Sequence, residues 1–368
     1  MADAWIDGSP VALRAAAIEA AKLLKASRLP VVAGLGTDVD GARAAIGLAA
    51  QIGGVIDHMD SRALLRDLDV AREAGMMAMT PNEAALRADA LLLVGPGLEI
   101  AWPDLDTRLV ERRPAPEVAD RFRRRVFRLC PGTKTRERSE REAVIGRARK
   151  DLPAVLAALR ATVAGRPCRK LRDASAIDRL AAELRAACFG VAIWSSAELD
   201  ALMIEMLCGL VNDLNRTTRF SGLPLMSGGH AAGVLEVCGW MTGFPMRTGF
   251  CRGFPEHDPW RFEASRLVAS GETDCALWIS AYRAAAPDWD GNLPTIALTG
   301  ADAKFRRRPP RVHIAVGRPG LDHDAVEWFV PTATLAWTSA KHKSEAISVA
   351  QAIGQIALGL ASDRALPC

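Results

Sequence analysis

A glycine pair after a short apolar run is the first feature of this 368-residue chain that could do chemistry. Gly34-Leu-Gly36 follows Val31-Val-Ala33, and Asp57 comes about 20 residues later, which imitates a dinucleotide-binding fingerprint. The third glycine of that fingerprint would stand where the chain has Val39. An isolated Gly-x-Gly is a weak signal, so a nicotinamide enzyme is a disfavoured alternative.

Cysteine and histidine spacings match no common metal motif. No two of the eight cysteines lie within four residues of each other, which excludes the Cys-x-x-Cys pairs of zinc ribbons and iron–sulfur clusters. The six histidines form neither His-x-x-x-His nor His-Glu-x-x-His. His323, in Leu-Asp-His-Asp, is the most ligand-like of them, although a surface turn is the favoured interpretation.

Most of the cysteines stand in apolar runs, as buried free thiols do, and the chain shows no signal peptide. Both features predict a cytoplasmic protein in a reducing environment. No apolar run approaches the roughly 20 residues that span a bilayer, so we expect no membrane association. The net charge of +4 and the low aromatic content also argue against nucleic acid as a partner.

The segment 111–150 is the most basic part of the chain. It carries fourteen Lys and Arg against six Asp and Glu, a local charge of +8 that exceeds the charge of the whole chain. A second basic loop spans residues 304–311. A solvated face or contact with a partner is favoured over an acidic ligand. The candidate contact residues are Arg121, Arg123, Arg124, Arg125, Arg306, Arg307 and Arg308.

Two similar successions of elements position these residues. A helix, the strand at Val31-Val-Ala33, a helix capped by Thr37, and a strand ending at Asp57 form a β-α-β unit. A helix, a strand at 190–194 and a second helix repeat that order. The repeat predicts an α/β fold with one doubly wound sheet built from residues 1–57 and 171–368, and with a basic α/β domain, 58–170, inserted between them. The glycine-rich stretch Ser221–Trp260 is expected to be a buried or half-buried irregular loop region, either a ligand loop or a packed crossover.

Several segments, in order, resemble the B subunit of formylmethanofuran dehydrogenase, a member of the molybdopterin oxidoreductase superfamily. The similar segments are Trp5-Ile-Asp-Gly8, Pro30-Val-Val-Ala-Gly34, Ala49-Ala-Gln-Ile-Gly-Gly-Val-Ile-Asp57, Leu86-Arg-Ala-Asp-Ala90 before Leu91-Leu-Leu-Val-Gly95, and Gly239-Trp-Met-Thr-Gly-Phe-Pro245 with Arg252-Gly-Phe-Pro255. The resemblance covers almost the whole chain and rests on order and spacing. It implies a discontinuous α/β domain with a second α/β domain inserted.

The departures from that family concern its metal chemistry. The resemblance implies a four-cysteine cluster segment before Trp5, and this chain begins without it. It also implies a Cys-His-Gly motif shortly after the second strand, where this chain has Asp57-His-Met-Asp60. A soft metal needs a thiolate there, so we expect the tungsten- or molybdenum-pterin and the 4Fe-4S sites to be lost and no cofactor to be bound.

This pattern is most similar to the B subunit of the bacterial formyltransferase/hydrolase complex. The resemblance implies a non-catalytic structural subunit that assembles with a formyltransferase subunit, an amidohydrolase-like subunit and a C subunit. Such a complex converts formyl-tetrahydromethanopterin to formate through a methanofuran-type carrier. The basic loops would face these partners or the carrier. The alternative is a pterin-dependent formylmethanofuran dehydrogenase with an atypical metal ligand such as Asp57 or Asp60.

Overall fold

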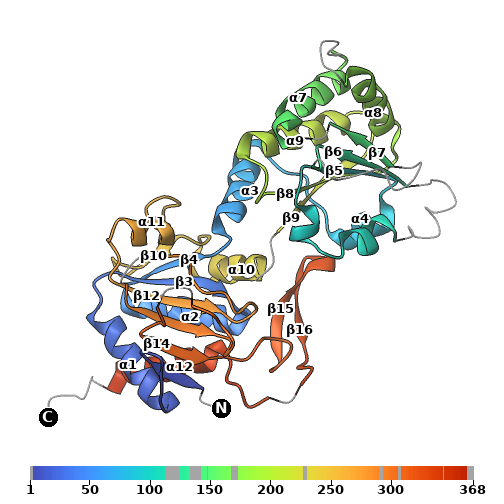
Figure 1. The fold of residues 1–368 in the computed structure, drawn as a ribbon. Helices are drawn as coiled ribbons and strands as arrows, with labels where there is room; N and C mark the ends of the chain where they lie inside the picture. The colour runs from blue at the N-terminus through green and yellow to red at the C-terminus, as the bar shows by residue number, and fades with distance from the viewer. Residues whose placement is uncertain are drawn as a thin grey trace. The chain divides into compact units, whose positions relative to one another are not determined.

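The computed structural model describes residues 3–112, 124–132, 142–146, 148–166, 173–226, 230–289, 293–305, 308–342 and 344–362. These residues form two compact units, and most of their elements are labelled in Figure 1. Unit 1 comprises Met1–Ser61, Gly229–Trp328 and Leu335–Cys368, and unit 2 comprises Arg62–Gly228 with Phe329–Thr334. None of the helices in these described ranges combines the length and the apolar character that crossing a membrane requires.

A nine-stranded sheet organises unit 1, in the order β11-β10-β4-β3-β12-β13-β14-β1-β2. The strands are β1 Ala4–Ile6, β2 Ser9–Pro10, β3 Pro30–Gly36, β4 Val55–His58, β10 Thr248–Gly249, β11 Glu256–His257, β12 Cys275–Ser280, β13 Thr295–Thr299 and β14 Val312–Ala315. The central five, β4-β3-β12-β13-β14, are parallel. Taken in chain order their arrangement is 2-1-3-4-5, which is the flavodoxin-like order, and the switch point lies between β3 and β12.

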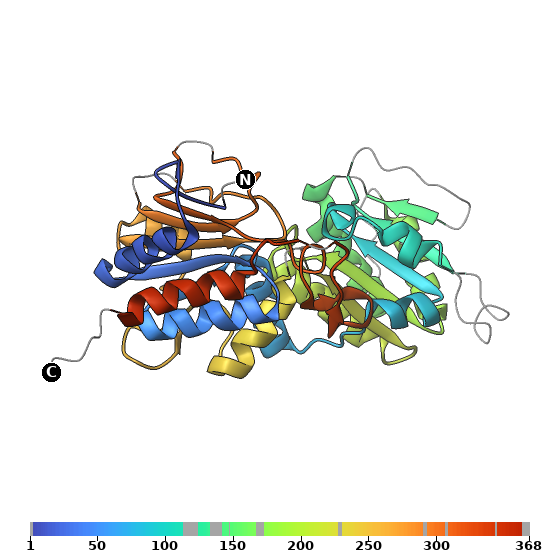
Figure 2. The ribbon, with the colours of Figure 1, turned by 90° about the horizontal axis from the view of Figure 1, so that it is seen from below.

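Three helices lie side by side against this sheet: α1 Leu13–Ala26, α2 Val39–Ile52 and α12 Val349–Ser362. Figure 2 shows α12 between α1 and α2. Small residues permit this close packing, since a Cβ added at Gly359 of α12 would stand 2.8 Å from the Cβ of Ala21. The apolar stripe of α1 is correspondingly made of Ala16, Ala17, Ala20 and Ala21 with Leu24.

Unit 2 is built on a five-stranded parallel sheet in the order β7-β6-β5-β8-β9. Its strands are β5 Ala90–Val94, β6 Arg125–Leu129, β7 Glu142–Ile145, β8 Gly190–Ser195 and β9 Phe220–Leu225. Its helices are α3 Ser61–Ala74, α4 Pro81–Arg87, α5 Leu98–Ala101, the short π-helix η1 Asp106–Val110, α7 Leu152–Val163, α8 Ala174–Ala186 and α9 Ala201–Leu214.

Alternation along β5 explains why both faces of this sheet are covered. Leu92 and Val94 belong to the core formed with α7, α8 and α9, whereas Leu91 and Leu93 belong to the core formed with α4, α5 and η1. Successive side chains of a strand point to opposite faces, so a strand buried on both sides is apolar throughout. The prediction that the chain has an α/β fold is therefore confirmed.

The expected domain boundaries need correction. The strands at Val31-Val-Ala33 and at 190–194 do not share one sheet: β3 lies in unit 1, and β8 lies in unit 2, where it pairs with β5. Because β8 and β9 continue the sheet begun by β5, the inserted unit extends to Gly228, and the predicted insert of 58–170 is too short.

The glycine-rich stretch Ser221–Trp260 is also more regular than expected. Most of it folds into the end of β9, helix α10 Ala231–Thr242 and the paired strands β10 and β11. Gly233 within α10 has a packing role, because an added Cβ there would overlap the ring of His230. The composition indicated a loop because glycine is a poor helix former, and the helix forms here despite that preference.

We expect Gly34→Ala to destabilise unit 1 by about 2 kcal/mol or more, because Gly34 has φ +80° and an added Cβ would stand 2.5 Å from the carbonyl oxygen of Ile279. Gly47→Ala is the matched control: Gly47 lies inside α2 with nothing within 4 Å of an added Cβ. It should be neutral or stabilise by up to about 1 kcal/mol. Urea denaturation of the two variants followed by tryptophan fluorescence checks this, and equal effects would contradict it.

Candidate functional site

The carboxyl edge of the unit 1 sheet is the candidate site, because ligands of open α/β sheets bind outside the strand ends at the switch point. Gly34 and Gly36 stand here at the end of β3. They serve strand packing: an added Cβ at Gly34 would meet the Ile279 carbonyl oxygen, and one at Gly36 would stand 3.0 Å from Cε of Met59. This accounts for the Gly-x-Gly pattern without a phosphate loop.

Helix α2 begins directly after β3, and its N-terminus is closed by a carboxylate. Asp38, rather than the expected Thr37, is the N-cap, and its Oδ1 accepts hydrogen bonds from Gly41 N at 3.1 Å and from Thr37 Oγ1 at 3.0 Å. Asp40 adds a second negative charge in the first turn. The positive end of the helix is thereby compensated by the chain itself.

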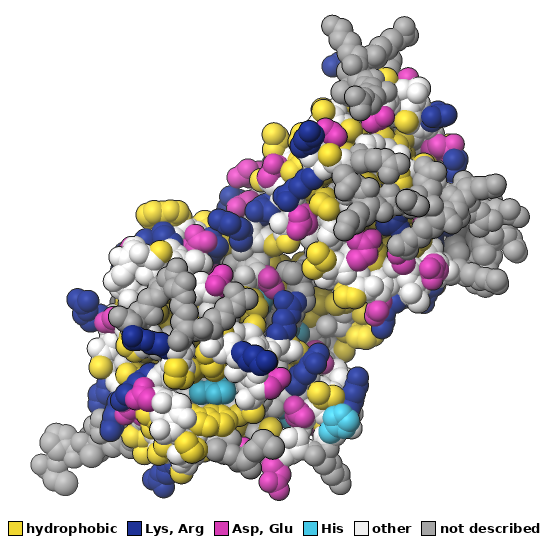
Figure 3. All heavy atoms as spheres, in the orientation of Figure 1, with side chains coloured by type: hydrophobic (Ala, Val, Ile, Leu, Met, Phe, Trp, Pro, Cys, Tyr) yellow, Lys and Arg dark blue, Asp and Glu magenta, His cyan; other side chains and the backbone are white. Residues whose placement is uncertain are grey.

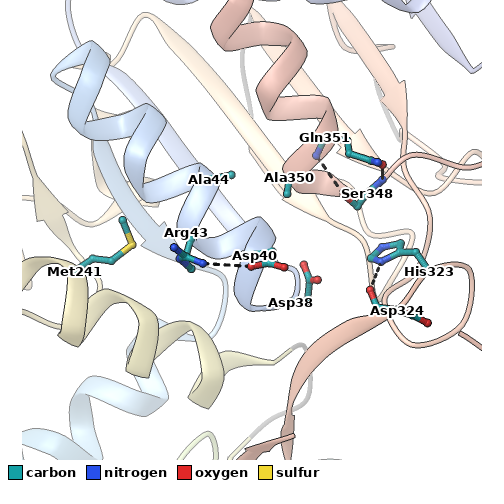
Figure 4. Close-up of a pocket in the computed structure, with 10 residues that line it drawn as sticks. All are labelled: Asp38, Asp40, Arg43, Ala44, Met241, His323, Asp324, Ser348, Ala350 and Gln351. Atoms are coloured by element: carbon teal, nitrogen blue, oxygen red, sulfur yellow. Dashed lines mark hydrogen bonds and ion pairs between the residues drawn. The ribbon is translucent and has the colours of Figure 1, made fainter. Parts of the chain in front are cut away.

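Two cavities open along this edge. The first has a volume of about 740 Å³ and is drawn in Figure 4. It is lined by Asp38, Asp40, Arg43, Ala44, Met241, His323, Asp324, Ser348, Ala350 and Gln351. The second, of about 540 Å³, lies at the ends of β12, β13 and β14, and its charged lining residues are Asp3, Asp302, Asp322, Glu345 and Arg318. Carboxylates outnumber cations in both.

Burial shapes the electrostatics of the first cavity. Asp38 is only 3% exposed, and this desolvation raises its pKa above the ordinary value, opposed by its hydrogen bonds to Gly41 and Thr37. His323 makes a 2.8 Å hydrogen bond from Nδ1 to the carbonyl oxygen of Asp324, and its Nε2 is buried without a hydrogen-bond partner among the described residues. The sequence analysis favoured a surface turn for His323, whereas the structure places it in the lining of this cavity.

A half-buried aromatic pair lies near the same edge. The ring of Tyr282 stacks on that of His230 at 5.8 Å, and its hydroxyl donates to Glu327 Oε1 at 2.9 Å. Nε2 of His230 accepts a hydrogen bond from the backbone N–H of Trp328, and burial lowers the pKa of His230 to about 4. Sequence reasoning missed the Tyr282–Glu327 contact, because only the fold brings β15 (Ala325–Phe329) to the end of β12.

Asp57, the acidic residue of the dinucleotide-like pattern, is engaged inside unit 1. Its Oδ2 accepts from Ala264 N at 2.9 Å, and its Oδ1 lies 3.6 Å from Nε of Arg247, which also pairs with Glu263 at 3.1 Å. Burial raises the pKa of Asp57 to about 6, with Arg247 opposing the shift. Asp57 therefore positions the chain before α11 (Ala264–Ala269) rather than facing a ribose.

Metal coordination finds no support in the described ranges. No group of three or more His, Cys, Asp or Glu among these residues is arranged to hold a metal ion. Asp60, the other candidate atypical ligand, lies in the turn after β4, where its backbone N–H donates to Nδ1 of His58 at 2.9 Å.

The basic segment separates into different kinds of residue. The prediction that Arg124 contacts a partner is wrong, because this side chain is buried. It donates to the carbonyl oxygens of Ala85, Ala88, Leu109 and Arg112. Burial lowers its pKa to about 10. It joins the C-terminal carbonyls of α4 and η1, which is a structural role.

Arg125 next to it is half exposed and pairs with Glu183, and Arg308 is exposed. The remaining candidates, Arg121, Arg123, Arg306 and Arg307, lie outside the described residues. On the face shown in Figure 3, basic and acidic side chains of the described residues are interspersed.

Comparisons with known proteins decide the family. No family model matches the chain. The B subunit of the formyltransferase/hydrolase complex Fhc of Methylorubrum extorquens is 34% identical over 339 residues, which cover 92% of this chain and 91% of that protein. The chain belongs to the family of Fhc B subunits. A crystal structure of the FhcABCD complex of that organism with methylofuran contains a chain of the same fold, with a TM-score of 0.88, 32% identity, and coverage of 98% of this chain and 99% of that one.

This chain is also similar, over about a fifth of its length, to the dehydrogenases named in the predicted resemblance. The B subunit of a tungsten-containing formylmethanofuran dehydrogenase 2 of Methanocaldococcus jannaschii is 36% identical over 77 residues, which cover 21% of this chain and 18% of that protein. The resemblance found in the sequence, to the B subunit of formylmethanofuran dehydrogenase and most closely to that of the formyltransferase/hydrolase complex, is thus confirmed.

Asp57→Asn should alter how the stability of this Fhc B-subunit homologue depends on pH. Because the folded-state pKa of Asp57, about 6, lies above the ordinary 3.8, the folded protein holds the proton more tightly. The stabilisation of the folded state that results from this tighter proton binding is complete below pH ~4 and is lost as the pH rises through about 6. The stability of wild type relative to Asp57→Asn should therefore fall by up to about 3 kcal/mol from pH ~4 to ~7. Urea titrations at several pH values measure this, and a constant difference would contradict it.

Arg124→Ala and Arg125→Ala test the assignment of two adjacent arginines to different roles. Arg124→Ala removes the donor to four carbonyls and should destabilise unit 2 by about 3 kcal/mol or more. Arg125→Ala removes a half-exposed ion pair with Glu183 and should cost less than about 1 kcal/mol. Denaturant unfolding of both variants provides the comparison, and similar losses would refute the distinction.

Proposed function

We propose that this chain is a non-catalytic structural subunit of a formyltransferase/hydrolase complex. The observation that carries the proposal is similarity at 34% identity over 92% of the chain, together with the TM-score of 0.88 to a chain of the FhcABCD crystal structure. Similarity over more than nine tenths of both chains supports an equivalent place in an equivalent assembly. We place this chain with a formyltransferase subunit, an amidohydrolase-like subunit and a C subunit in the cytoplasm.

In the proposed complex, a formyl group passes from tetrahydromethanopterin to a methanofuran-type carrier and leaves as formate. The methylofuran in the related crystal structure supports a carrier of this class. Amide hydrolysis and formyl transfer would belong to the other subunits, and this chain would hold them in place.

We further propose that the chain keeps a molybdopterin-oxidoreductase-like fold without its pterin dinucleotide, metal or iron–sulfur cluster. A pyrophosphate calls for unsatisfied N–H donors and cations. The described edge instead offers an α2 N-terminus capped by Asp38, and a second cavity with the four carboxylates Asp3, Asp302, Asp322 and Glu345 against Arg318. These residues do not fit the cofactor, because like charges would face it without compensation. The alternative dehydrogenase with Asp57 as a metal ligand is disfavoured, since Asp57 is held by Ala264 N and Arg247.

We also propose that the exposed residues Arg125 and Arg308, which lie in the two basic segments, contact a partner subunit or the carrier. Such contacts would steer an acidic surface or an anionic carrier toward the complex. Arg124 is left out, because its guanidinium is buried among carbonyls.

The test is a compositional measurement on the complex purified without oxygen from its own cells. We expect co-purification of formyltransferase and amidohydrolase-like subunits, with tungsten, molybdenum and pterin far below one per copy of this chain. Stoichiometric tungsten or molybdenum with pterin would contradict the loss of the cofactor. Absence of the two catalytic subunits would contradict the structural role.

A further inference from the structure

The cavity of Figure 4 is unusual in the kind of hydrogen-bonding groups it leaves unused. Oδ1 of Asp38 accepts the hydrogen bond that caps α2, and Oδ1 of Asp324 accepts one from the backbone N–H of Ala340, at 2.8 Å. The second oxygen of each carboxylate has no hydrogen bond among the described residues. His323 donates from Nδ1 to a carbonyl, and in the neutral imidazole its buried Nε2, which has no hydrogen-bond partner among the described residues, is an acceptor as well.

Several of the donors around this cavity are engaged within the chain. The N-terminus of α12 is closed by a reciprocal cap, in which Gln351 N donates to Ser348 Oγ at 3.2 Å and Ser348 N donates to Gln351 Oε1 at 2.8 Å. Arg43 pairs with Asp40 at 3.5 Å. Figure 4 shows Asp38 at the N-terminus of α2 and Asp40 and Arg43 on that helix, with His323 and Asp324 across the cavity from them. The site is therefore acceptor-rich, and it disfavours anions.

One wall of the cavity is apolar and continues onto an exposed surface. Met241 at the end of α10 lines the cavity with Ala44 and Ala350. Met241 is 42% exposed, its neighbour Trp240 is 53% exposed, and Phe244 just beyond α10 is 38% exposed. An apolar patch joined to an acceptor-rich cavity is typical of a protein interface with a charged anchor.

We propose that this cavity receives an arginine side chain from a partner subunit of the complex. The guanidinium would donate to Asp38, Asp324 and Nε2 of His323, and its aliphatic stem would lie along Met241 and Ala350. Arginine fits better than lysine, because the acceptors come from separate segments and a planar guanidinium offers five donors in a fixed fork. An apolar residue beside that arginine would cover Trp240. The inference rests on the proposed function, since it requires the hetero-oligomer.

The experiment uses the tagged chain co-produced with the formyltransferase, amidohydrolase-like and C subunits. Asp38→Asn with Asp324→Asn removes two charges while keeping the amide oxygens that cap α2 and accept from Ala340. The control, Glu73→Gln with Asp178→Asn, removes the same charge from two exposed residues of unit 2. Dissociation constants for the remaining subunits are measured across a sodium chloride series. We expect the cavity variant to bind about 10- to 100-fold more weakly and with a shallower salt dependence, and the control to match wild type.

A second variant guards against a folding artefact. Ala350→Leu leaves every charge in place and fills the space predicted for the arginine stem, so it should weaken assembly as well. Thermal unfolding of each isolated variant must match wild type. If wild type itself fails to bind the other subunits, the proposed function fails. If wild type binds and both variants bind as tightly as the control, the arginine inference is overturned while the structural role stands. An electron microscopy map of the complex in which solvent fills the cavity would overturn it equally.

Discussion

Parallel pairing between β3 and β12 is the contact on which unit 1 depends. β3 precedes the inserted unit and β12 follows it, so this pairing joins the two parts of a discontinuous sheet. The register brings Gly34 against the carbonyl of Ile279, where any side chain would collide with the neighbouring strand. A pairing between segments so distant in sequence carries a loop-closure cost, which the buried strands and the layer of α1, α2 and α12 offset.

The same pairing creates the switch point, and the chain engages several of the polar groups there internally. Asp38 caps α2, Asp57 holds the segment before α11, and Tyr282 donates to Glu327. Buried polar groups that are already satisfied do not need a ligand. A protein named for tungsten is similar to this chain over 77 residues, but similarity of sequence or fold does not by itself carry site chemistry. What the edge retains is a set of acceptors, and these suit a protein side chain better than a phosphate.

Arg124 and Arg125 show why charge counts along a sequence do not locate a surface. Both stand at the start of β6, where successive side chains point to opposite faces of the sheet. The Arg124 side chain donates to carbonyl oxygens at the ends of α4 and η1. The Arg125 side chain pairs with Glu183 at the surface. In the described part of the basic segment, Arg124 and Arg128 are thus buried, whereas Arg112, Arg125, Arg149 and Lys150 are exposed.

The sequence by itself determined the α/β class, most of the buried strands and the family, because these depend on local apolar runs, caps and the order of short motifs. It also indicated the absence of the metal-binding cysteine, since residue types are read directly. Only the tertiary structure decided that β8 and β9 join β5, that Ser221–Trp260 contains a helix, and that Asp38, His323 and Asp324 line one cavity. Strand partners and the lining of a cavity are set by packing between segments far apart in the chain, and local patterns carry no record of that packing. Glycine's low helix propensity is a weak guide, and it misled the prediction for Ser221–Trp260.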